Sequence, residues 1–191
     1  MTTAASATAL TGLSAGTWTI DPVHSHASFS VRHMMVSKVR GSFRAFSGAI
    51  VVPENGEPTA TAEIAVDSFD TGNPQRDGHI RSADFLEVET YPTMNFRSTG
   101  LRSAGSDFIL DGELTLHGVT RPVELELEFN GVNAGMGDGP VAGFEAKTVL
   151  TVAISASTST CPLRVAASSS ATRSTSPWRS RLSCRPDASS R

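Results

Sequence analysis

The chain has 191 residues, a formal net charge of −3 and only 6% aromatic residues. This length fits one domain, or one domain followed by a tail. No apolar run approaches the roughly 20 residues of a membrane-spanning helix, so an integral helical membrane protein is excluded. The slight acidity argues against a nucleic-acid binder, and two cysteines cannot build a disulfide framework.

The charge is divided unevenly along the chain. Residues 1–151 carry ten Lys or Arg and eighteen Asp or Glu, a net charge of −8. Residues 152–191 carry six arginines and a single acid, a net charge of +5, and they hold both cysteines. The sequence therefore predicts a flexible leader at 1–15, a domain at 16–151 and a tail at 152–191. Because the leader has neither the basic start nor the apolar stretch of a secretory signal, we expect a cytoplasmic protein.

Residues 16–151 alternate between apolar and polar side chains with the period of two that is typical of β-strands. The clearest case is the stretch from Val123 to Phe129, in which three glutamates separate the apolar residues. Turn-forming segments separate such stretches, for example at 53–56 and 103–106. The pattern indicates strands with one apolar and one polar face, as in antiparallel sheets.

One segment, 73–86, breaks the alternation. It is dense in polar residues, and Pro74 suits the first turn of a helix. We expect one or two short helices within 74–86 that cross an end of the sheet.

Many strands that share one apolar face can bury it by closing into a barrel, which leaves no free edge. A barrel of about eight strands has either a packed interior or room for one ligand. Small residues on the apolar face favour a cavity: Ala27, Ala45, Ala49, Ala60, Ala62 and Gly112. The alternative is a packed sandwich or a filled barrel, in which small residues merely fit the geometry.

Polar residues that might carry chemistry form two groups. His24 and His26 would share a face of a strand, but no zinc-ligand spacing, serine-nucleophile elbow or nucleotide-binding loop accompanies them. The sequence therefore predicts no catalytic residue, no metal ligand and no cofactor. The polar set in 73–79 either anchors the short helix or forms a polar lip around a cavity mouth.

Three long motifs resemble the YceI-like family, in order along the chain: WTIDPVHSHASFSVRHMMVSKVRGSF, DTGNPQRDGHIRSADFLEVETYPTMNFRS and GELTLHGVTRPVELELEF. The resemblance implies an all-β, extended, lipocalin-like antiparallel barrel. It also implies non-enzymatic binding, transport or storage of a long isoprenoid, such as a polyprenyl phosphate or a quinone, in an apolar channel. The expected channel residues are Phe29, Val31, Ile64, Val66, Phe96, Leu114, Leu125 and Leu127. The motif positions expected at a polar mouth are His24, Ser25, Asn73, Arg76, Asp77 and His79.

Two other functions stay open at this point. One is a metal-dependent or histidine-based enzyme that uses His24, His26 and His79. The other is a structural or stress-response interaction module with a filled barrel. The sequence leaves the oligomeric state open between a monomer and a homodimer, and it predicts no nucleic-acid partner.

The tail departs from the family pattern in a way that a reading-frame error explains. If one base were lost at the Thr151–Val152 junction, each tail codon would supply the second and third bases of an original codon. Ser168, Ser169 and Ser170, read as TCx, would then restore three codons that always encode Val, Ile, Leu or Phe. With suitable codons the tail restores a glycine-rich turn and an alternating strand. We therefore expect that the last strand of the barrel is lost and that the tail is disordered.

Overall fold

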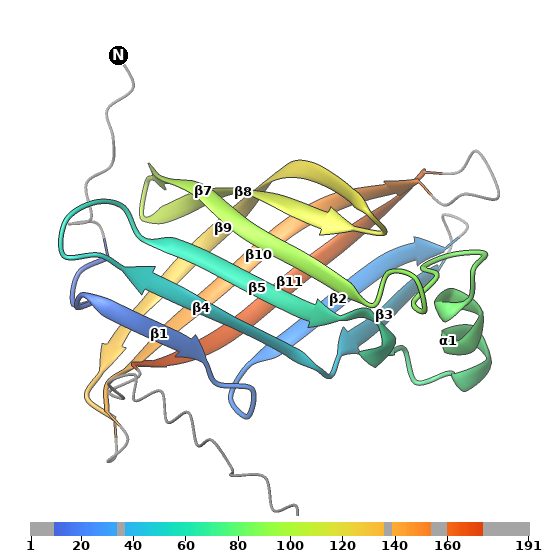
Figure 1. The fold of residues 1–191 in the computed structure, drawn as a ribbon, viewed down its shortest axis with the longest axis horizontal. Coiled ribbons are helices and arrows are strands. Elements are labelled where there is room, and N and C mark those ends of the chain that lie inside the picture. Colours follow the sequence, from blue (N-terminus) through green and yellow to red (C-terminus); the bar gives the residue numbers. More distant parts are fainter. Residues whose placement is uncertain (1–9, 34–36, 136–138, 154–159, 174–191) are drawn as a thin grey trace, which may run out of the picture.

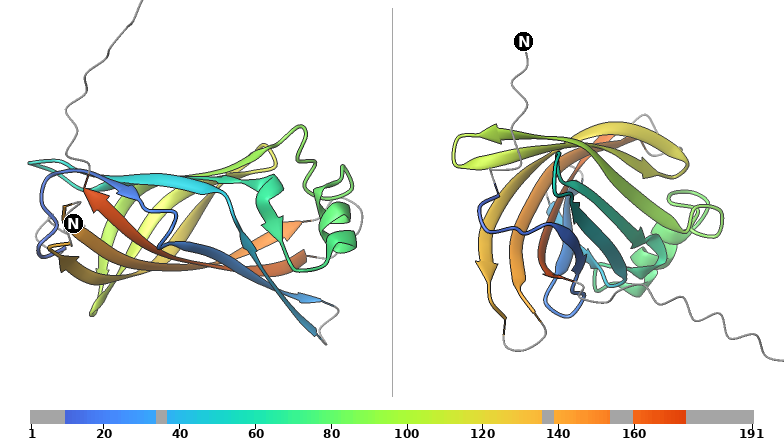
Figure 2. Two further views of the ribbon diagram at one scale, coloured as in Figure 1. Left: turned by 90° about the horizontal axis from the view of Figure 1, so that it is seen from below. Right: turned by 60° about the vertical axis from the view of Figure 1, so that its left-hand side comes forward.

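The computed structural model describes residues 10–33, 37–135, 139–153 and 160–173. Their regular structure is almost entirely antiparallel β-strand, in one sheet that curls around on itself (Figures 1 and 2). In chain order the elements are β1 (Gly16–Ile20), β2 (His26–His33), β3 (Ser37–Phe43), β4 (Phe46–Val52), β5 (Thr59–Ala65), the 3-10 turn η2 (Val66–Ser68), β6 (Phe69–Asp70), α1 (Pro74–Arg81), β7 (Thr93–Ala104), β8 (Asp107–Leu116), β9 (Val119–Asn133), β10 (Val141–Ala153) and β11 (Thr160–Arg173).

The strands follow the order β1-β4-β5-β7-β8-β9-β10-β11-β2-β3-β6, and β1 also pairs with β11. The pairing of β1 with both β4 and β11 closes a ring. The prediction of an extended, antiparallel, lipocalin-like barrel is therefore confirmed.

The alternation that predicted strands is visible in their burial. On β9, Leu127 is buried and Leu125 half-buried, whereas the glutamates at 124, 126 and 128 are exposed. The apolar members face the inside of the barrel because successive side chains of a strand point to opposite faces.

The expected helix is shorter than the segment proposed for it. α1 spans Pro74–Arg81, and the residues after it form turns. Asn73 caps the helix, since its side-chain oxygen accepts a hydrogen bond from the Arg76 backbone N–H. In the described part of the chain, no helix has the length and apolar character needed to span a membrane.

Two apolar clusters fill the two ends of the barrel. Trp18, which is fully buried, is the centre of the first, with side chains from β4, β7, β8 and β10. The second lies at the end where α1 packs (Figure 1) and contains stacked phenylalanine rings, Phe29 and Phe69, at a centroid distance of 4.6 Å. The space between the two clusters is where a cavity can form.

The closing strand is present, which corrects the expectation that it is lost. β11 pairs with β10 along its whole length, and its other edge pairs first with β2 and then with β1. A strand ladder is made by backbone groups, so a segment of unusual composition can complete it. The inward positions Ala167, Ser169 and Ala171 are also small enough to enter the interior without a bulky polar group. Of the other tail residues, Val152 and Ala153 end β10, and the rest lie outside the described ranges.

The expected inward small residues are mostly confirmed. Ala27, Ala60, Ala62 and Gly112 belong to the inner face, but Ala45 and Ala49 do not. Ala45 lies exposed in the break between β3 and β4, and on β4 Ala49 alternates with the inward residue Ile50. The break shifts the alternation, which a sequence pattern without strand ends cannot reveal.

Candidate functional site

A cavity lies inside the barrel, between the two apolar clusters. Its volume, counted as space open to the centre of a water molecule, is about 190 Å³. A single water needs roughly 10–15 Å³ on this measure, so the cavity is much larger than a site for one trapped water. The described interior is thus hollow rather than filled.

The wall of the cavity is apolar and carries no fixed charge. Leu, Ile, Phe, Val and Ala side chains from β4, β5, β7, β8, β9 and β10 make up most of it, and the polar contributions are Ser and Thr residues and His26. No Asp, Glu, Lys or Arg is among the described residues that line it. Such a wall suits a hydrocarbon chain, because burying each CH₂ contributes about 0.8 kcal/mol.

Five of the eight expected channel residues line this cavity: Ile64, Phe96, Leu114, Leu125 and Leu127. The other three do not. Phe29 and Val66 are buried in the phenylalanine cluster, and Val31 packs against it. They are inward-facing as predicted, but at this end of the barrel the side chains of η2 and β6 fill the interior.

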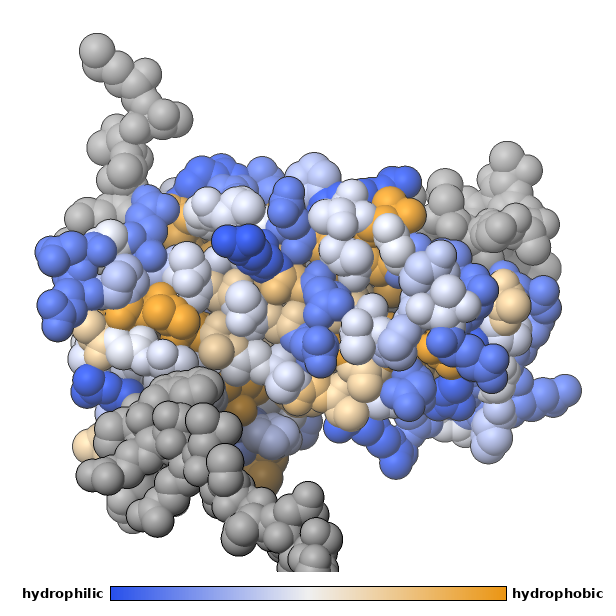
Figure 3. All heavy atoms as spheres, viewed as in Figure 1, coloured by the Kyte–Doolittle hydropathy of each residue, from blue (hydrophilic) through white to orange (hydrophobic). Residues whose placement is uncertain are grey.

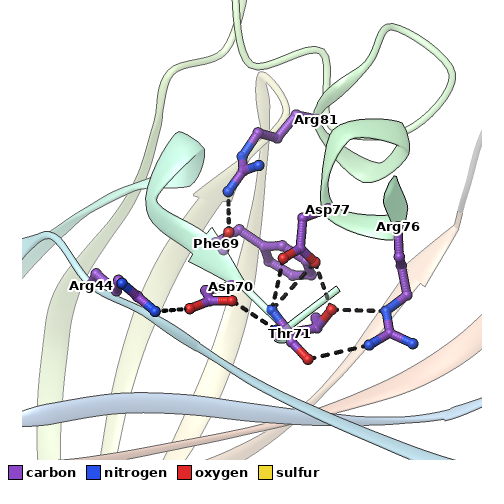
Figure 4. A network of polar contacts seen from close by, with 8 residues as sticks. Arg44, Phe69, Asp70, Thr71, Arg76, Asp77 and Arg81 are labelled. Atoms are coloured by element: carbon purple, nitrogen blue, oxygen red, sulfur yellow. Dashed lines mark hydrogen bonds and ion pairs between the residues drawn. The ribbon is translucent and has the colours of Figure 1, made fainter. Parts of the chain in front are cut away.

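The expected polar mouth is not at the cavity, since none of its six residues lines it. Arg76 and Asp77 instead fix α1 to Thr71, just after the strand end that precedes it (Figure 4), and Asn73 caps the helix. The buried Asp77 carboxylate accepts hydrogen bonds from the Thr71 hydroxyl at 2.6 Å and from the Thr71 backbone N–H at 3.1 Å. Arg76 donates to the same hydroxyl at 2.8 Å. Nearby, Arg44 pairs with Asp70 (Figure 4). The anchoring interpretation of this cluster is the one that the geometry supports.

The remaining expected mouth residues are dispersed. His24, in the β1–β2 connection, pairs with Asp21 at 2.7 Å, and that hydrogen bond is the main reason why the pKa of the Asp21 carboxyl lies below its ordinary value. Ser25 is buried. His79, on α1, packs edge-to-face against the ring of Phe85, with a distance of 4.7 Å between the ring centroids. No group of three or more His, Cys, Asp or Glu in the described ranges is arranged to hold a metal ion.

Sequence reasoning missed two parts of the wall. One is the inner face of β10, where Phe144, Ala146, Thr148 and Leu150 line the cavity. Their period of two was available as a signal, although the polar Thr148 on the inner face and the apolar Val149 on the outer face weaken it. The other is His26, which was considered only as an alternative metal ligand or catalytic group.

The outside of the barrel is polar where the inside is apolar. On the β4–β5–β7 side, polar side chains are interspersed with smaller apolar areas (Figure 3). On β7 and β8, Arg102 forms hydrogen bonds to both carboxylate oxygens of Asp111, at 2.6 and 2.7 Å, and contacts Glu124 at 2.8 Å. The hydrogen bonds from Arg102 hold the pKa of Asp111 below its ordinary value, and the same pairing raises the pKa of Arg102.

Known proteins resemble the chain in sequence and in fold. The protein YceI of Escherichia coli O17:K52:H18 is 36% identical over 126 residues, which are 65% of this chain and 66%, just under two thirds, of that protein. Burkholderia cenocepacia BcnA superposes with a TM-score of 0.67 at 21% identity, covering 80% of this chain and 99% of BcnA. A polyisoprenoid binding domain from Saccharophagus degradans superposes with a TM-score of 0.63 at 17% identity, covering 82% of this chain and 98% of that domain. At these identities the two structures show a shared fold.

The family model of the YceI-like domain matches residues 18–154, which is most of the chain and nearly all of the barrel that precedes β11. With this match and the Escherichia coli relative, the chain belongs to the YceI-like family.

Proposed function

We propose that the protein binds a long isoprenoid lipid in the barrel cavity and transports or stores it without catalysing a reaction. The observation that carries the proposal is the cavity inside the barrel. Over the described residues, its wall is apolar and has no fixed charge. The polyisoprenoid binding domain of similar fold supports the same ligand class. The cytoplasmic location and the homodimer stay predictions.

The alternative of an enzyme built on His24, His26 and His79 has less support. His24 pairs with Asp21 in a loop, and His79 packs on Phe85 beside α1. Only His26 touches the cavity. A binding function needs no convergence of these side chains, so we favour it.

Equilibrium binding tests the proposal. Full-length protein freed of lipid is titrated with geranylgeraniol, a twenty-carbon isoprenoid alcohol. Ala60→Phe places a ring into the cavity, because Ala60 lines it. Ala49→Phe places the same ring on the outer side of the neighbouring strand β4. We expect saturable binding that Ala60→Phe abolishes and Ala49→Phe retains. Absence of binding to the unmodified protein, or equal binding by both variants, would contradict the proposal.

We also propose that residues 152–191 are read out of frame. The change in composition supports this origin, and so does the end of the family match at residue 154, three residues after the proposed junction. A chain with the restored frame would replace this Ser- and Thr-rich segment by the glycine-rich turn and the alternating, more apolar strand described above. We expect the restored chain to have a higher Tm and to bind lipid more tightly. Equal Tm values, or coding DNA whose frame matches that of closely related genes, would overturn this origin.

A further inference from the structure

The residues that precede β1 pack into one end of the barrel. β1 begins at the end opposite α1 (Figure 1). Leu10 is only 6% exposed and packs into the apolar cluster around Trp18, and Leu13 packs against the same cluster. Among the described residues, every other buried member of this cluster belongs to a strand. Leu10 therefore fills part of the barrel end without being part of the barrel wall.

Leu10 also lines the cavity. It does so together with Leu101 on β7 and Leu110 on β8, which are buried residues of the same cluster. Because all three side chains are buried and pack in one cluster, Leu10 lies on the inner side of the wall. Its side chain separates the cavity from this end of the barrel.

The segment that carries Leu10 is tied to the barrel at its C-terminal side. The Trp18 indole N–H donates a hydrogen bond to the Ser14 carbonyl oxygen at 3.0 Å, and the Arg173 guanidinium donates one to the Ala15 carbonyl oxygen at 2.8 Å. Residues 10–13 form a turn closed by its own backbone hydrogen bond of 3.1 Å, and they pack on the barrel through apolar side chains. This turn can therefore move away as a unit while the residues after it stay in place.

The other boundaries of the cavity are held by more than apolar contacts. The wall is a closed ring of paired strands, so separating two of them would break a row of backbone hydrogen bonds. The other end is filled by Phe29, Phe43 and Phe69, which all belong to strands, and it is covered by α1, which Asp77 anchors. Displacing residues 10–13 costs mainly apolar burial, which the methyl groups of an isoprenoid can replace because this burial is not directional.

We propose that residues 10–13 form a plug at the entrance of the binding site. The isoprenoid enters and leaves at this end of the barrel by displacing Leu10, and Ser14 and Ala15 are the pivot. The inference rests on the proposed binding of an isoprenoid and adds the route by which the lipid reaches the cavity. A lipid inside the closed barrel is released only when the plug opens.

A disulfide between the plug and the wall tests this route. A Cβ added at Gly12 would lie 3.8 Å from the Cβ of Val132, near the end of β9, which is a usual Cβ separation in disulfides. Full-length protein with Cys161→Ser and Cys184→Ser therefore receives Gly12→Cys and Val132→Cys. The control receives Gly12→Cys alone, which has the same left-handed backbone (φ 95°) but no partner. Titration of free thiols shows whether the bond has formed, and thermal unfolding checks that each variant folds.

Lipid exchange is then measured in both directions. The protein takes up radiolabelled geranylgeraniol from phosphatidylcholine vesicles and releases it to unlabelled vesicles. We expect the oxidised double-cysteine protein to exchange lipid about tenfold more slowly than its reduced form, because a locked plug cannot open. The control should exchange lipid equally under both conditions. Unchanged rates in the fully bonded protein would overturn the proposal, whereas no uptake by the unmodified protein would overturn lipid binding itself.

Two leucine variants test the same route without a disulfide. Leu10→Ala shortens the side chain of the plug, whereas Leu86→Ala removes the same atoms from the connection after α1, where Leu86 packs against the phenylalanine cluster. The shortened plug gives up less burial when it opens, so we expect Leu10→Ala to speed both uptake and release by about tenfold. Leu86→Ala should leave both rates unchanged. Faster exchange in Leu86→Ala, or unchanged exchange in Leu10→Ala, would place the entrance elsewhere and overturn the proposal while lipid binding stands.

Discussion

The ring of Phe96, on β7, lies directly over Gly112, on the neighbouring strand β8. A Cβ added at Gly112 would meet this ring and would also come within 2.6 Å of the Arg97 carbonyl oxygen. Phe96 can therefore lie across the inner face of β8 only because position 112 has no side chain. The same relationship recurs at the filled end of the barrel, where the Phe29 ring covers Gly41 on β3.

We predict that Gly112→Ala displaces the Phe96 ring and lowers the free energy of unfolding by about 1–3 kcal/mol, the usual cost of overpacking. The displaced ring should also change the affinity for geranylgeraniol, since Phe96 lines the cavity. Chemical denaturation and lipid titration measure the two effects. Gly100→Ala is the matched control, because at that position the nearest heavy atom is 3.9 Å away. Equal effects of the two substitutions would contradict this packing account.

The two Phe–Gly pairs also separate folding from binding. Phe29 stacks on Phe69 and does not line the cavity, whereas Phe96 does. We predict that Phe29→Leu lowers the free energy of unfolding by about 1–2 kcal/mol through lost aromatic packing, with unchanged lipid affinity below the melting transition. Phe96→Leu should change the affinity. If Phe29→Leu weakened binding as much as Phe96→Leu, the cavity would extend to the phenylalanine cluster.

Asp77 anchors α1, and its removal has a predictable cost. Asp77→Ala would leave the Thr71 hydroxyl and backbone N–H without their buried acceptor. An unsatisfied buried donor costs about 1–3 kcal/mol, and we expect denaturant unfolding to show a loss of that size. Asp84→Ala, at an exposed position after the helix, should have little effect. Comparable losses for both would mean that the loss of an acidic side chain, rather than of these hydrogen bonds, lowers stability.

The outer ion pair on β7 and β8 predicts a pH dependence. Folding lowers the pKa of Asp111, so its ion pair with Arg102 stabilises the folded state. This stabilisation is fully present above the ordinary aspartate pKa of about 3.9, and it is lost as the pH falls through the lower pKa that Asp111 has in the folded state. Arg102→Gln should therefore lower the free energy of unfolding at pH 7. The difference in free energy of unfolding between the variant and the unmodified protein should shrink as the pH is lowered. Denaturation of both proteins between pH 7 and pH 3 measures this difference. The control is Arg97→Gln on the same strand. Its free energy of unfolding relative to the unmodified protein should change less with pH.

The strand pattern was sufficient to predict the fold because one face of each strand is apolar. Leu125 and Leu127 were placed on the inner face by alternation with glutamates, and the structure agrees. Alternation gives the face of a side chain but not its position along the barrel, so Phe29 and Val66 were assigned to the channel although they lie in the filled end.

The polar residues were harder to place because their surroundings depend on where strands stop. Arg76 and Asp77 were expected at a mouth, but α1 packs over the filled end, where they bond to Thr71. His26 is on the outer face by alternation and is nevertheless among the residues that line the cavity. Which strand residues surround the cavity follows from strand register, which this sequence does not reveal without the fold.

Native mass spectrometry of the full-length protein, purified under conditions that retain lipid, tests most directly whether the barrel is an isoprenoid carrier. We predict a main species heavier than the bare chain by one lipid, and a solvent extract that contains an isoprenoid alcohol or quinone. Ala49→Phe should retain this species, and Ala60→Phe should lose it. A spectrum of bare chain alone, together with an extract free of isoprenoid, would contradict the account.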